Sequence, residues 1–360
     1  MINTSRVNRI LDKLSGLDLD QLLICDPTAI FYLTGKWIFP GERFMALILK
    51  RDSAPTLIVS ELFRFDEEIG VNKIYFKDTD NIVPIVAGCL DERKHLGVDK
   101  NLAARFLLPM MEERIAVGFL NASIAVDMTR SVKDEIEREK MRQASIVNDK
   151  AMDKFKGLVQ TGISELEVAG QMLDIYKSLG ASGYSFDPIV AFGPNAADPH
   201  HMPDDTRLKE GDTVLFDVGC VLNDYCSDMT RTFFYKAEPD AEGKKVYELV
   251  KRANQEAEDM LKAGIPLCDV DAKARDIITE GGYGPNFTHR LGHFIGVETH
   301  EYGDVSAANK NLTEVGNTFS IEPGIYVPGG IGVRIEDLVL ITEDGREVLN
   351  SYSKELEVIG

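Results

Sequence analysis

Short apolar runs separated by turn residues dominate the first third of the chain. The runs that predict buried strands are 21–25, 43–50, 55–60 and 123–127. Helical spacing is found at 101–118 and, near the N-terminus, at Val7, Ile10, Leu11 and Leu14. These patterns predict a small α/β domain at the start of the chain.

The pattern changes near 128–132. Residues 132–160 are highly charged, and apolar residues recur at Ile136, Met141, Ile146 and Met152, as in a long surface helix. We therefore expect two domains, 1–131 and 132–360, which also agrees with a length greater than one core usually supports.

Several further helices and strands are predicted in the second domain. A capping-box pattern at Ser164-Glu165-Leu166-Glu167 starts one helix and Gly180 ends it. Two more helices fit 244–263 and 270–280, each followed by glycine. Strands are predicted at 213–220, 229–235, 318–326 and 333–342. Helices combined with hairpins predict an α+β domain.

Composition and charge exclude several classes of protein. The chain is 44% hydrophobic and 28% charged, as in ordinary globular proteins, and its net charge of −19 argues against a nucleic-acid partner. No apolar run approaches the roughly 18 residues of a membrane span, and the N-terminus lacks a signal core, so we expect a cytoplasmic protein. Five scattered cysteines are expected to be reduced thiols.

Common catalytic motifs are absent. There is no G-x-S-x-G elbow, P-loop, G-x-G-x-x-G or Asp-Thr-Gly, and His300-Glu301 does not begin an H-E-x-x-H zinc helix. Five of the six histidines, however, lie between residues 200 and 300, which favours a site over isolated structural roles. They are His200, His201, His289, His293 and His300.

Four carboxylates interrupt β-prone runs. Residues facing each other across a hairpin have a constant sum of residue numbers, so facing Asp217 and Asp228 would centre a turn between Leu222 and Asn223. Glu322 and Glu336 would centre a second turn at Gly329, within Pro328-Gly329-Gly330. Two hairpins thus each bring two acids together on apolar strands.

Such acids can be buried together only if they are protonated or bind cations. Two divalent ions would neutralise four carboxylates, with His293 as a neutral fifth ligand. This oxygen-rich set suits Mn²⁺, with Co²⁺ or Zn²⁺ as alternatives. Two ions sharing carboxylates can bridge a water, lower its pKa and stabilise a tetrahedral oxyanion.

These residues lie in motifs that resemble those of the pita-bread metallopeptidases, in particular Xaa-Pro dipeptidases (prolidases) and Xaa-Pro aminopeptidases (aminopeptidase P). The resemblance covers essentially the whole chain, including Tyr32-Leu33-Thr34-Gly35 in the first domain. The second-domain motifs are Phe192-Gly193-Pro194-Asn195-Ala196-Ala197-Asp198-Pro199-His200, Phe216-Asp217-Val218-Gly219, Ser227-Asp228-Met229-Thr230-Arg231-Thr232, His289-Arg290-Leu291-Gly292-His293, His300-Glu301, Ile321-Glu322-Pro323-Gly324 and Val333-Arg334-Ile335-Glu336-Asp337.

The resemblance implies a role for each matching residue. The dimetal ligands would be Asp217, Asp228, His293, Glu322 and Glu336, with Asp228 and Glu336 bridging and Glu322 also acting as base or proton shuttle. His200 and His300 would contact the scissile carbonyl and its oxyanion. His289 and Arg334 would hold the proline side and carboxylate of the substrate. Tyr225 and Tyr326 would be pocket or supporting residues, and His201 and His95 structural or surface residues.

The resemblance implies hydrolysis of the Xaa-Pro imide bond, expected in its trans isomer, by a metal-bridging hydroxide. A dipeptidase is preferred and an aminopeptidase acting on longer peptides is the alternative. A metal-free hydrolase resembling creatinase would have lost ligands, and a silent binding protein would hold no metal. A homodimer is expected. Two departures, Phe294 in place of a usual glycine and Gly303 in place of a common proline, concern the pocket.

Overall fold

The computed structural model describes residues 1–360 and contains two compact units, Met1–Arg130 and Ser131–Gly360. The strands of the first unit are β1 (Gln21–Ile24), β2 (Met45–Lys50), β3 (Thr56–Ser60), β4 (Asn72–Phe76), β5 (Leu96–Val98) and β6 (Phe119–Asn121). They form one mixed sheet in the order β4-β3-β2-β1-β5-β6. The predicted strands at 21–25, 43–50 and 55–60 are confirmed, with small differences at their ends.

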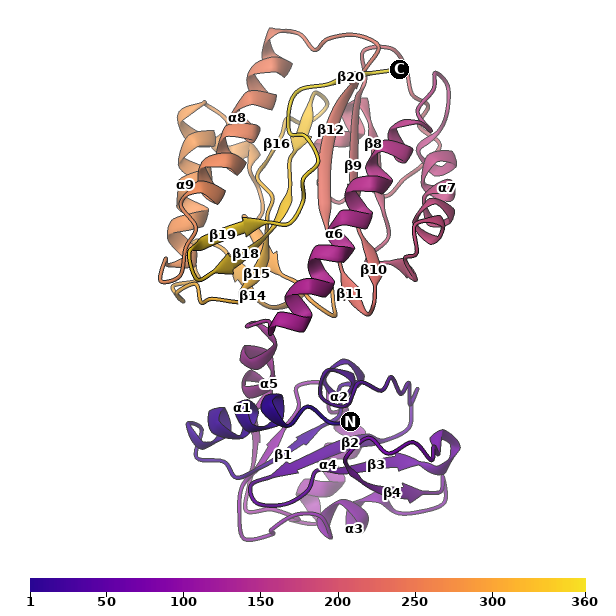
Figure 1. Cartoon of the computed structure of the whole chain (residues 1–360), viewed down its shortest axis with the longest axis vertical. Coiled ribbons are helices and arrows are strands. Elements are labelled where there is room, and N and C mark those ends of the chain that lie inside the picture. Colours follow the sequence, from indigo (N-terminus) through magenta and orange to yellow (C-terminus); the bar gives the residue numbers. More distant parts are fainter. The chain divides into compact units, whose positions relative to one another are not determined.

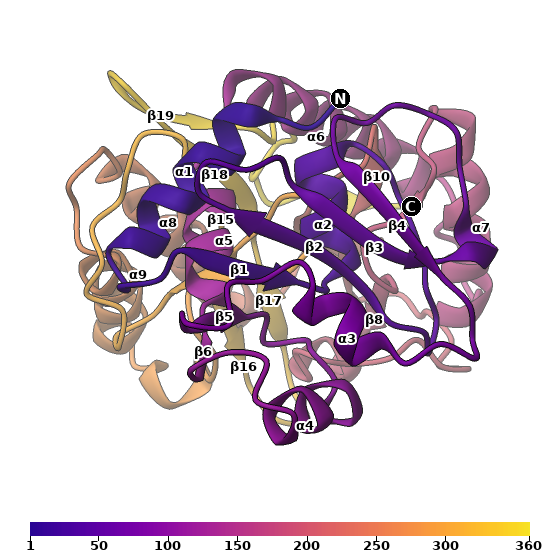
Figure 2. The same cartoon turned by 90° about the horizontal axis from the view of Figure 1, so that it is seen from below.

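Helices cover both faces of this sheet (Figures 1 and 2). They are α1 (Thr4–Ser15), α2 (Pro27–Thr34), α3 (Ile82–Ala87), α4 (Ala104–Glu112) and α5 (Ser123–Arg130), and η1 (Glu61–Phe63) is a short 3₁₀ helix. Because side chains alternate along a strand, Leu22 packs with α1, α2 and α5, whereas Leu23 packs with α3 and α4. The result is a three-layer α/β unit.

One prediction for this unit was wrong and another was only partly correct. Residues 123–127 form the start of helix α5 because the Asn121 side chain accepts a hydrogen bond from the Ser123 N–H, and Ala125 and Val126 then face the core beside α1. The strand lies just before, at β6. Only Ala104–Glu112 of the predicted helix 101–118 is helical, and Arg114, at φ +54°, follows its end.

The second unit is α+β, as predicted. Its helices are α6 (Glu135–Lys156), α7 (Glu165–Ser178), α8 (Ala241–Asp259) and α9 (Leu267–Glu280), with η2 (Gly193–Ala197) and η3 (Gly284–Asn286). Its strands are β7 (Gly183–Tyr184), β8 (Ile189–Phe192), β9 (Thr213–Val218), β10 (Cys220–Leu222), β11 (Tyr225–Cys226), β12 (Met229–Tyr235), β13 (Gly292–Phe294), β14 (Glu301–Val305), β15 (Thr318–Ile321), β16 (Gly324–Tyr326), β17 (Gly332–Arg334), β18 (Asp337–Thr342), β19 (Gly345–Val348) and β20 (Val358–Ile359).

Two helix pairs pack on two groups of strands in this unit (Figure 1). Helices α6 and α7 share a core with β8, β9, β10 and β12, and helices α8 and α9 share another with β13, β15 and β18. The predicted capping box is present: the Ser164 hydroxyl accepts from the Glu167 N–H, and the Glu167 side chain accepts from the Ser164 N–H. All five cysteines are free thiols.

The buried face of α6 differs from the predicted one. Met141 and Met152 are buried, but Ile136 and Ile146 are exposed. The buried positions instead follow the 3.6-residue period of a helix, through Met141, Ala144, Ala151 and Phe155. The four predicted apolar positions are five or six residues apart and do not fit this period.

One of the two predicted hairpin registers is correct. Strands β16 and β17 pair Tyr326 with Gly332 around a turn centred at Gly329, as predicted. In the other hairpin the turn lies one residue later, at Asn223-Asp224, and Asp217 faces Thr230 and not Asp228. Both turn residues have positive φ, the requirement of a two-residue hairpin turn. Asp228 keeps the predicted face because a shift of two residues preserves side-chain alternation.

Strands β12 and β17 join the two groups of strands. The Thr232 hydroxyl donates to the Arg334 carbonyl and accepts from the Arg334 N–H, and the Glu336 N–H donates to the Thr230 carbonyl. The acidic residues at the ends of β9, β12, β15 and β17 therefore lie near one another.

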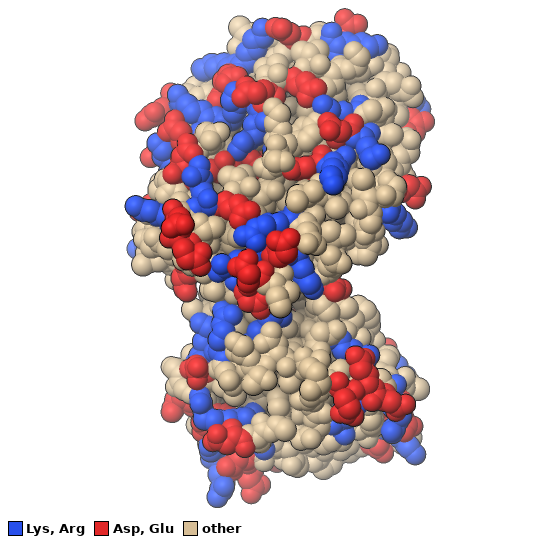
Figure 3. Space-filling model, in the orientation of Figure 1, with Lys and Arg blue, Asp and Glu red and all other residues tan.

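Charges of both signs are interspersed over the second unit on the face drawn in Figure 3. No helix in the structure has both the length and the apolar character needed to cross a bilayer. Neither feature identifies a partner.

Candidate active site

A cavity of about 400 Å³ lies among the strand ends of the second unit. Asp217 ends β9, Asp228 precedes β12, and His293 is in the middle of β13. Glu322 and Glu336 occupy the short breaks after β15 and β17. Nine of the residues singled out from the sequence line this cavity: Asp217, Asp228, His293, Glu322, Glu336, His200, His289, His300 and Arg334.

Three of the expected metal ligands are grouped most tightly. Asp228, His293 and Glu336 each offer an atom within 4.8 Å of the others, and all three are buried. His293 Nε2 is 3.5 Å from Asp228 Oδ2 and 3.7 Å from Glu322 Oε1. Asp217 lies outside this group of three, and its Oδ2 accepts a 2.7 Å hydrogen bond from Arg334.

The buried acids cannot all be ionised without added positive charge. Burial, followed by the nearby Asp217 and Glu322, raises the pKa of Asp228 well above its usual value. Burial and then Asp228 and Glu322 do the same to the pKa of Glu336. Burial also raises the pKa of Asp217, although Arg334 opposes that shift.

The donor set fits divalent cations. Asp217 Oδ1 and Asp228 Oδ1 are buried and have no hydrogen-bond partner, which is costly for a carboxylate unless something binds it. Four carboxylates with one imidazole form an oxygen-rich set of donors, which suits divalent cations.

Hydroxyl groups orient the glutamates. Thr230 donates a 2.7 Å hydrogen bond to Glu336 Oε2 and accepts one from Arg334 Nε. Ser320 donates to Glu322 Oε1 and accepts from the His293 N–H. Such supporting contacts fix ligand geometry. The sequence predicted neither role, although Thr230 faces Asp217 once the β12 register is known.

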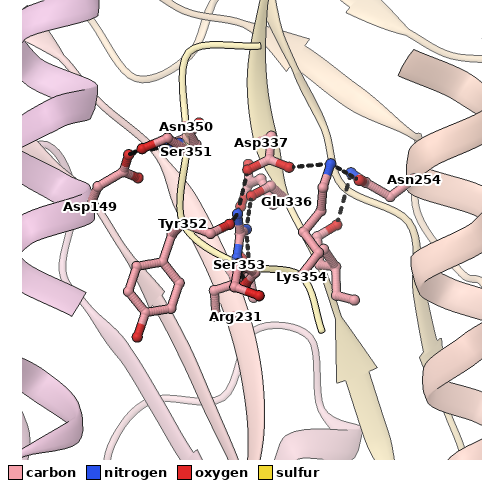
Figure 4. A network of polar contacts seen from close by, with 12 residues as sticks. Asp149, Arg231, Asn254, Glu336, Asp337, Asn350, Ser351, Tyr352, Ser353 and Lys354 are labelled. Carbon is pink, nitrogen blue, oxygen red and sulfur yellow. Dashed lines mark hydrogen bonds and ion pairs between the residues drawn. The ribbon is translucent and has the colours of Figure 1, made fainter. Parts of the chain in front are cut away.

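An ionic network lies behind Glu336 (Figure 4). The Arg231 guanidinium contacts Asp337 Oδ1 at 2.6 Å and also donates to the Glu336 carbonyl at 2.6 Å. Lys354 Nζ lies 2.8 Å from Asp337 Oδ2 and 2.7 Å from Glu258 Oε2. These two cations and two carboxylates balance one another in a nearly fully buried position.

The same network holds the backbone before both glutamates. Asn254 accepts a hydrogen bond from Lys354 and donates to the Ile321 carbonyl at 2.9 Å and the Ile335 carbonyl at 3.5 Å. Ile321 and Ile335 immediately precede Glu322 and Glu336. The network therefore connects the C-terminal segment, through Lys354, to the position of two candidate ligands.

The histidines differ in their contacts. His289 Nδ1 donates to the Arg290 carbonyl, and Nε2 lies 2.9 Å from the Tyr326 hydroxyl. The His200 and His300 rings make no hydrogen bond within the protein, and the His300 ring lies against His293. Burial and then the charge of His293 lower the pKa of His300 to about 4, which favours a neutral imidazole.

Other singled-out residues lie away from the cavity lining. The Tyr225 hydroxyl donates to Glu137, and Tyr225 is not among the residues that line the cavity. Tyr326 does not line the cavity, and its hydroxyl contacts His289 Nε2 and Arg334 Nη1. His201 Nε2 is 2.6 Å from the fully buried Glu165, and His95 is exposed in the first unit.

The two departures from the family pattern pack against each other. Phe294 is a core residue beside Phe319 and does not line the cavity. Gly303 has φ +113°, and a Cβ there would lie 2.7 Å from the Phe294 ring. A proline cannot adopt this φ. Phe294 and Gly303 therefore contribute to core packing near His300 and do not form part of the cavity surface.

Gly303→Ala is expected to lower the free energy of unfolding by about 1–3 kcal/mol, because the new methyl group meets the Phe294 ring. Denaturant unfolding measures this loss. In a Phe294→Ala background the loss should shrink to the backbone strain alone. Gly330→Ala, where a Cβ would make only looser contacts and φ is not positive, is the control. Equal losses in both backgrounds would contradict the proposed contact.

Lys354→Met should destabilise the protein by about 3–5 kcal/mol, because it leaves the buried Asp337 and Glu258 carboxylates with less positive charge. The matched control is Lys251→Met. Lys251 pairs with the exposed Glu355, and its loss should cost under about 1 kcal/mol. Urea unfolding of both variants provides the comparison. Similar midpoints would show that the buried network contributes little.

Family models match both units. The model of metallopeptidase family M24 matches residues 139–343, and that of the creatinase/prolidase N-terminal domain matches residues 6–132. An "uncharacterized peptidase" of Staphylococcus aureus (strain bovine RF122 / ET3-1) is 39% identical over 366 residues, covering 97% of this chain and 100% of that protein.

Solved structures are similar over nearly the full length. The prolidase from Pyrococcus horikoshii OT3 is 32% identical with a TM-score of 0.89, covering 98% of this chain and 99% of that one. The X-Pro aminopeptidase from Thermotoga maritima MSB8 is 28% identical with a TM-score of 0.84, covering 96% and 100%. The chain is a metallopeptidase of family M24 and belongs to its pita-bread group of prolidases and Xaa-Pro aminopeptidases.

Proposed function

We propose that this protein is an Xaa-Pro dipeptidase that uses two divalent metal ions. One observation carries the proposal: buried carboxylates surround a small cavity, and two of their oxygens have no partner. Similarity to a prolidase over nearly the whole chain supports the substrate class.

Five residues would hold the metal ions: Asp217, Asp228, His293, Glu322 and Glu336. Mn²⁺ suits this set best, with Co²⁺ or Zn²⁺ as alternatives. The ions, when bound, would activate a water for attack and stabilise negative charge on the carbonyl oxygen.

The remaining steps belong to side chains of this chain. Glu322 would take a proton from the attacking water and deliver it to the leaving imide nitrogen. His200 and His300 have free ring nitrogens, so they could donate hydrogen bonds to the scissile carbonyl. A neutral His300 keeps an N–H for this purpose.

The cavity also suits a proline ring. Phe186, Ile189 and Pro199 provide apolar surface, and the imide nitrogen has no N–H that would need a partner. A volume of about 400 Å³ is near the lower end of ligand sites, which span roughly 300–1,000 Å³. This size favours a dipeptide. The likeness to an X-Pro aminopeptidase supports the alternative, removal of the first residue from longer peptides.

Replacing Glu336 tests the metal centre. Glu336→Ala and the more conservative Glu336→Gln should both reduce bound metal and Xaa-Pro hydrolysis by at least about 100-fold in turnover, since one ligand carboxylate is lost. Elemental analysis and dipeptide hydrolysis measure the two effects. Exposed Glu280→Gln should leave both unchanged. Retained activity in folded Glu336 variants would refute the assignment.

Substrate length separates the two candidate activities. A dipeptidase should hydrolyse Ala-Pro with a kcat/KM at least about tenfold above that for Ala-Pro-Ala, because the small cavity limits chain length. Chromatographic measurement of released alanine from each peptide makes the comparison. Faster cleavage of the tripeptide would favour the aminopeptidase.

A further inference from the structure

His200 lies on an irregular segment, residues 198–206, that follows the 3₁₀ helix η2 and precedes β9. Pro199 and His200 line the cavity, yet His200 is exposed and its ring makes no hydrogen bond within the protein. The segment contains no helix or strand, and its two prolines have no N–H to donate. The position of His200 is therefore set by the contacts of neighbouring residues.

The buried carboxylate of Glu165 ties this segment to the rest of the second unit. Glu165 is the first residue of α7 and is fully buried, and each of its carboxylate oxygens has two hydrogen-bond partners. Oε1 accepts from the Phe192 N–H at 2.7 Å and from Asn195 Nδ2 at 3.0 Å. Oε2 accepts from the Asp204 N–H at 3.0 Å and lies 2.6 Å from His201 Nε2. One carboxylate thus joins the segment to α7 and to the end of β8.

His201 provides the link nearest to the cavity. Among residues 199–203, the His201 ring alone makes a side-chain hydrogen bond. An ionised carboxylate only accepts hydrogen bonds, so the His201 nitrogen next to Glu165 carries a hydrogen atom and donates it. The His200 N–H in turn donates to Asp198 Oδ1. Of two adjacent histidines, one is therefore anchored and the other has a free ring at the cavity.

Glu165, His201 and Asp204 also lie close enough together to be considered as a cation site. The hydrogen bonds of Glu165 argue against a cation. A carboxylate offers about four acceptor positions, and all four are used here. The group also lies at the N-terminus of α7, where the helix dipole disfavours positive charge. The cluster is therefore an anchor made of hydrogen bonds and not a metal site.

The second free imidazole is anchored through its neighbour as well. Glu301 follows His300, and its Oε2 lies 2.9 Å from Nζ of the buried Lys133. Glu301 Oε1 accepts from the Val297 N–H at 2.9 Å. Each histidine expected to contact the scissile carbonyl is thus followed by a residue whose side chain is fixed by a buried partner.

We propose that His201 and Glu165 are positioning residues, whose contact holds the backbone of His200 at the cavity so that its free imidazole meets the scissile carbonyl. This inference rests on the proposed function. A donor that is already in place needs no ordering when negative charge develops on the carbonyl oxygen. Loss of the anchor should therefore lower kcat more than it raises KM.

Variants of His201 test the anchor in the metal-loaded enzyme. His201→Leu, which removes the hydrogen bond, should lower kcat for Ala-Pro about 10-fold or more and change KM by less than about threefold. His201→Gln should recover part of this loss, because an amide N–H can donate to Glu165 in place of the imidazole. Met202→Ala, at an exposed side chain of the same segment, is the matched control and should behave as wild type.

A double-mutant cycle separates positioning of His200 from a general structural effect. If His201 acts through His200, adding His201→Leu to His200→Ala should lower kcat by no more than about a further twofold. Equal losses with and without His200→Ala would overturn the proposal. An unchanged kcat in the single variant His201→Leu would overturn it too.

Hydrogen exchange provides a readout that does not depend on turnover. His201→Leu should speed exchange of the Asp204 amide and its neighbours by about threefold or more, while the interior of α7 keeps its protection. If wild type cleaves Ala-Pro and His201→Leu changes neither kcat nor this exchange, the positioning role is overturned and the dipeptidase activity stands. If fully metal-loaded wild type does not cleave Ala-Pro, the proposed function fails and the positioning role fails with it.

Discussion

The second unit is organised around the difficulty of burying several carboxylates within a few ångströms of one another. Behind Glu336, the protein solves this with its own cations: Arg231 and Lys354 balance Asp337 and Glu258. On the cavity side only Asp217 has such a partner, Arg334. Asp228, Glu322 and Glu336 lie near His293, the candidate imidazole ligand, and none of them pairs with a lysine or arginine. The excess negative charge is thus confined to the place where added cations would bind.

The position of these acids could be predicted because hairpin geometry is local. The Glu322–Glu336 register followed from a turn whose centre at Gly329 is marked by Pro328-Gly329-Gly330. The turn of the Asp217 hairpin lies at Asn223-Asp224, one residue later than predicted, so the partner of Asp217 shifts by two residues. Nothing in the sequence before the turn distinguished these two turn positions. The acidic side chains still lie close together, because a shift of two residues leaves each side chain on the same face of the strand.

Long-range contacts were beyond the reach of such patterns. Lys354 lies far along the chain from Asn254 and Glu258, and no local period signals that a C-terminal segment will complete a buried ion network. Arg231 within the apolar β12 run was a signal, because a charged residue there needs a buried partner. Helix α5 was misread for a related reason: Ala125 and Val126 fit a strand equally well until α1 packs against them.

Burial explains why two arginines beside one cavity can have different roles. Arg334 donates to Asp217 and to the Thr230 and Tyr326 hydroxyls, so its loss would leave the buried Asp217 carboxylate without a cationic partner. Arg290, by contrast, is exposed and has no hydrogen-bond or ion-pair partner in the protein. The more buried cation therefore contributes directly to the charge balance of the acidic cluster.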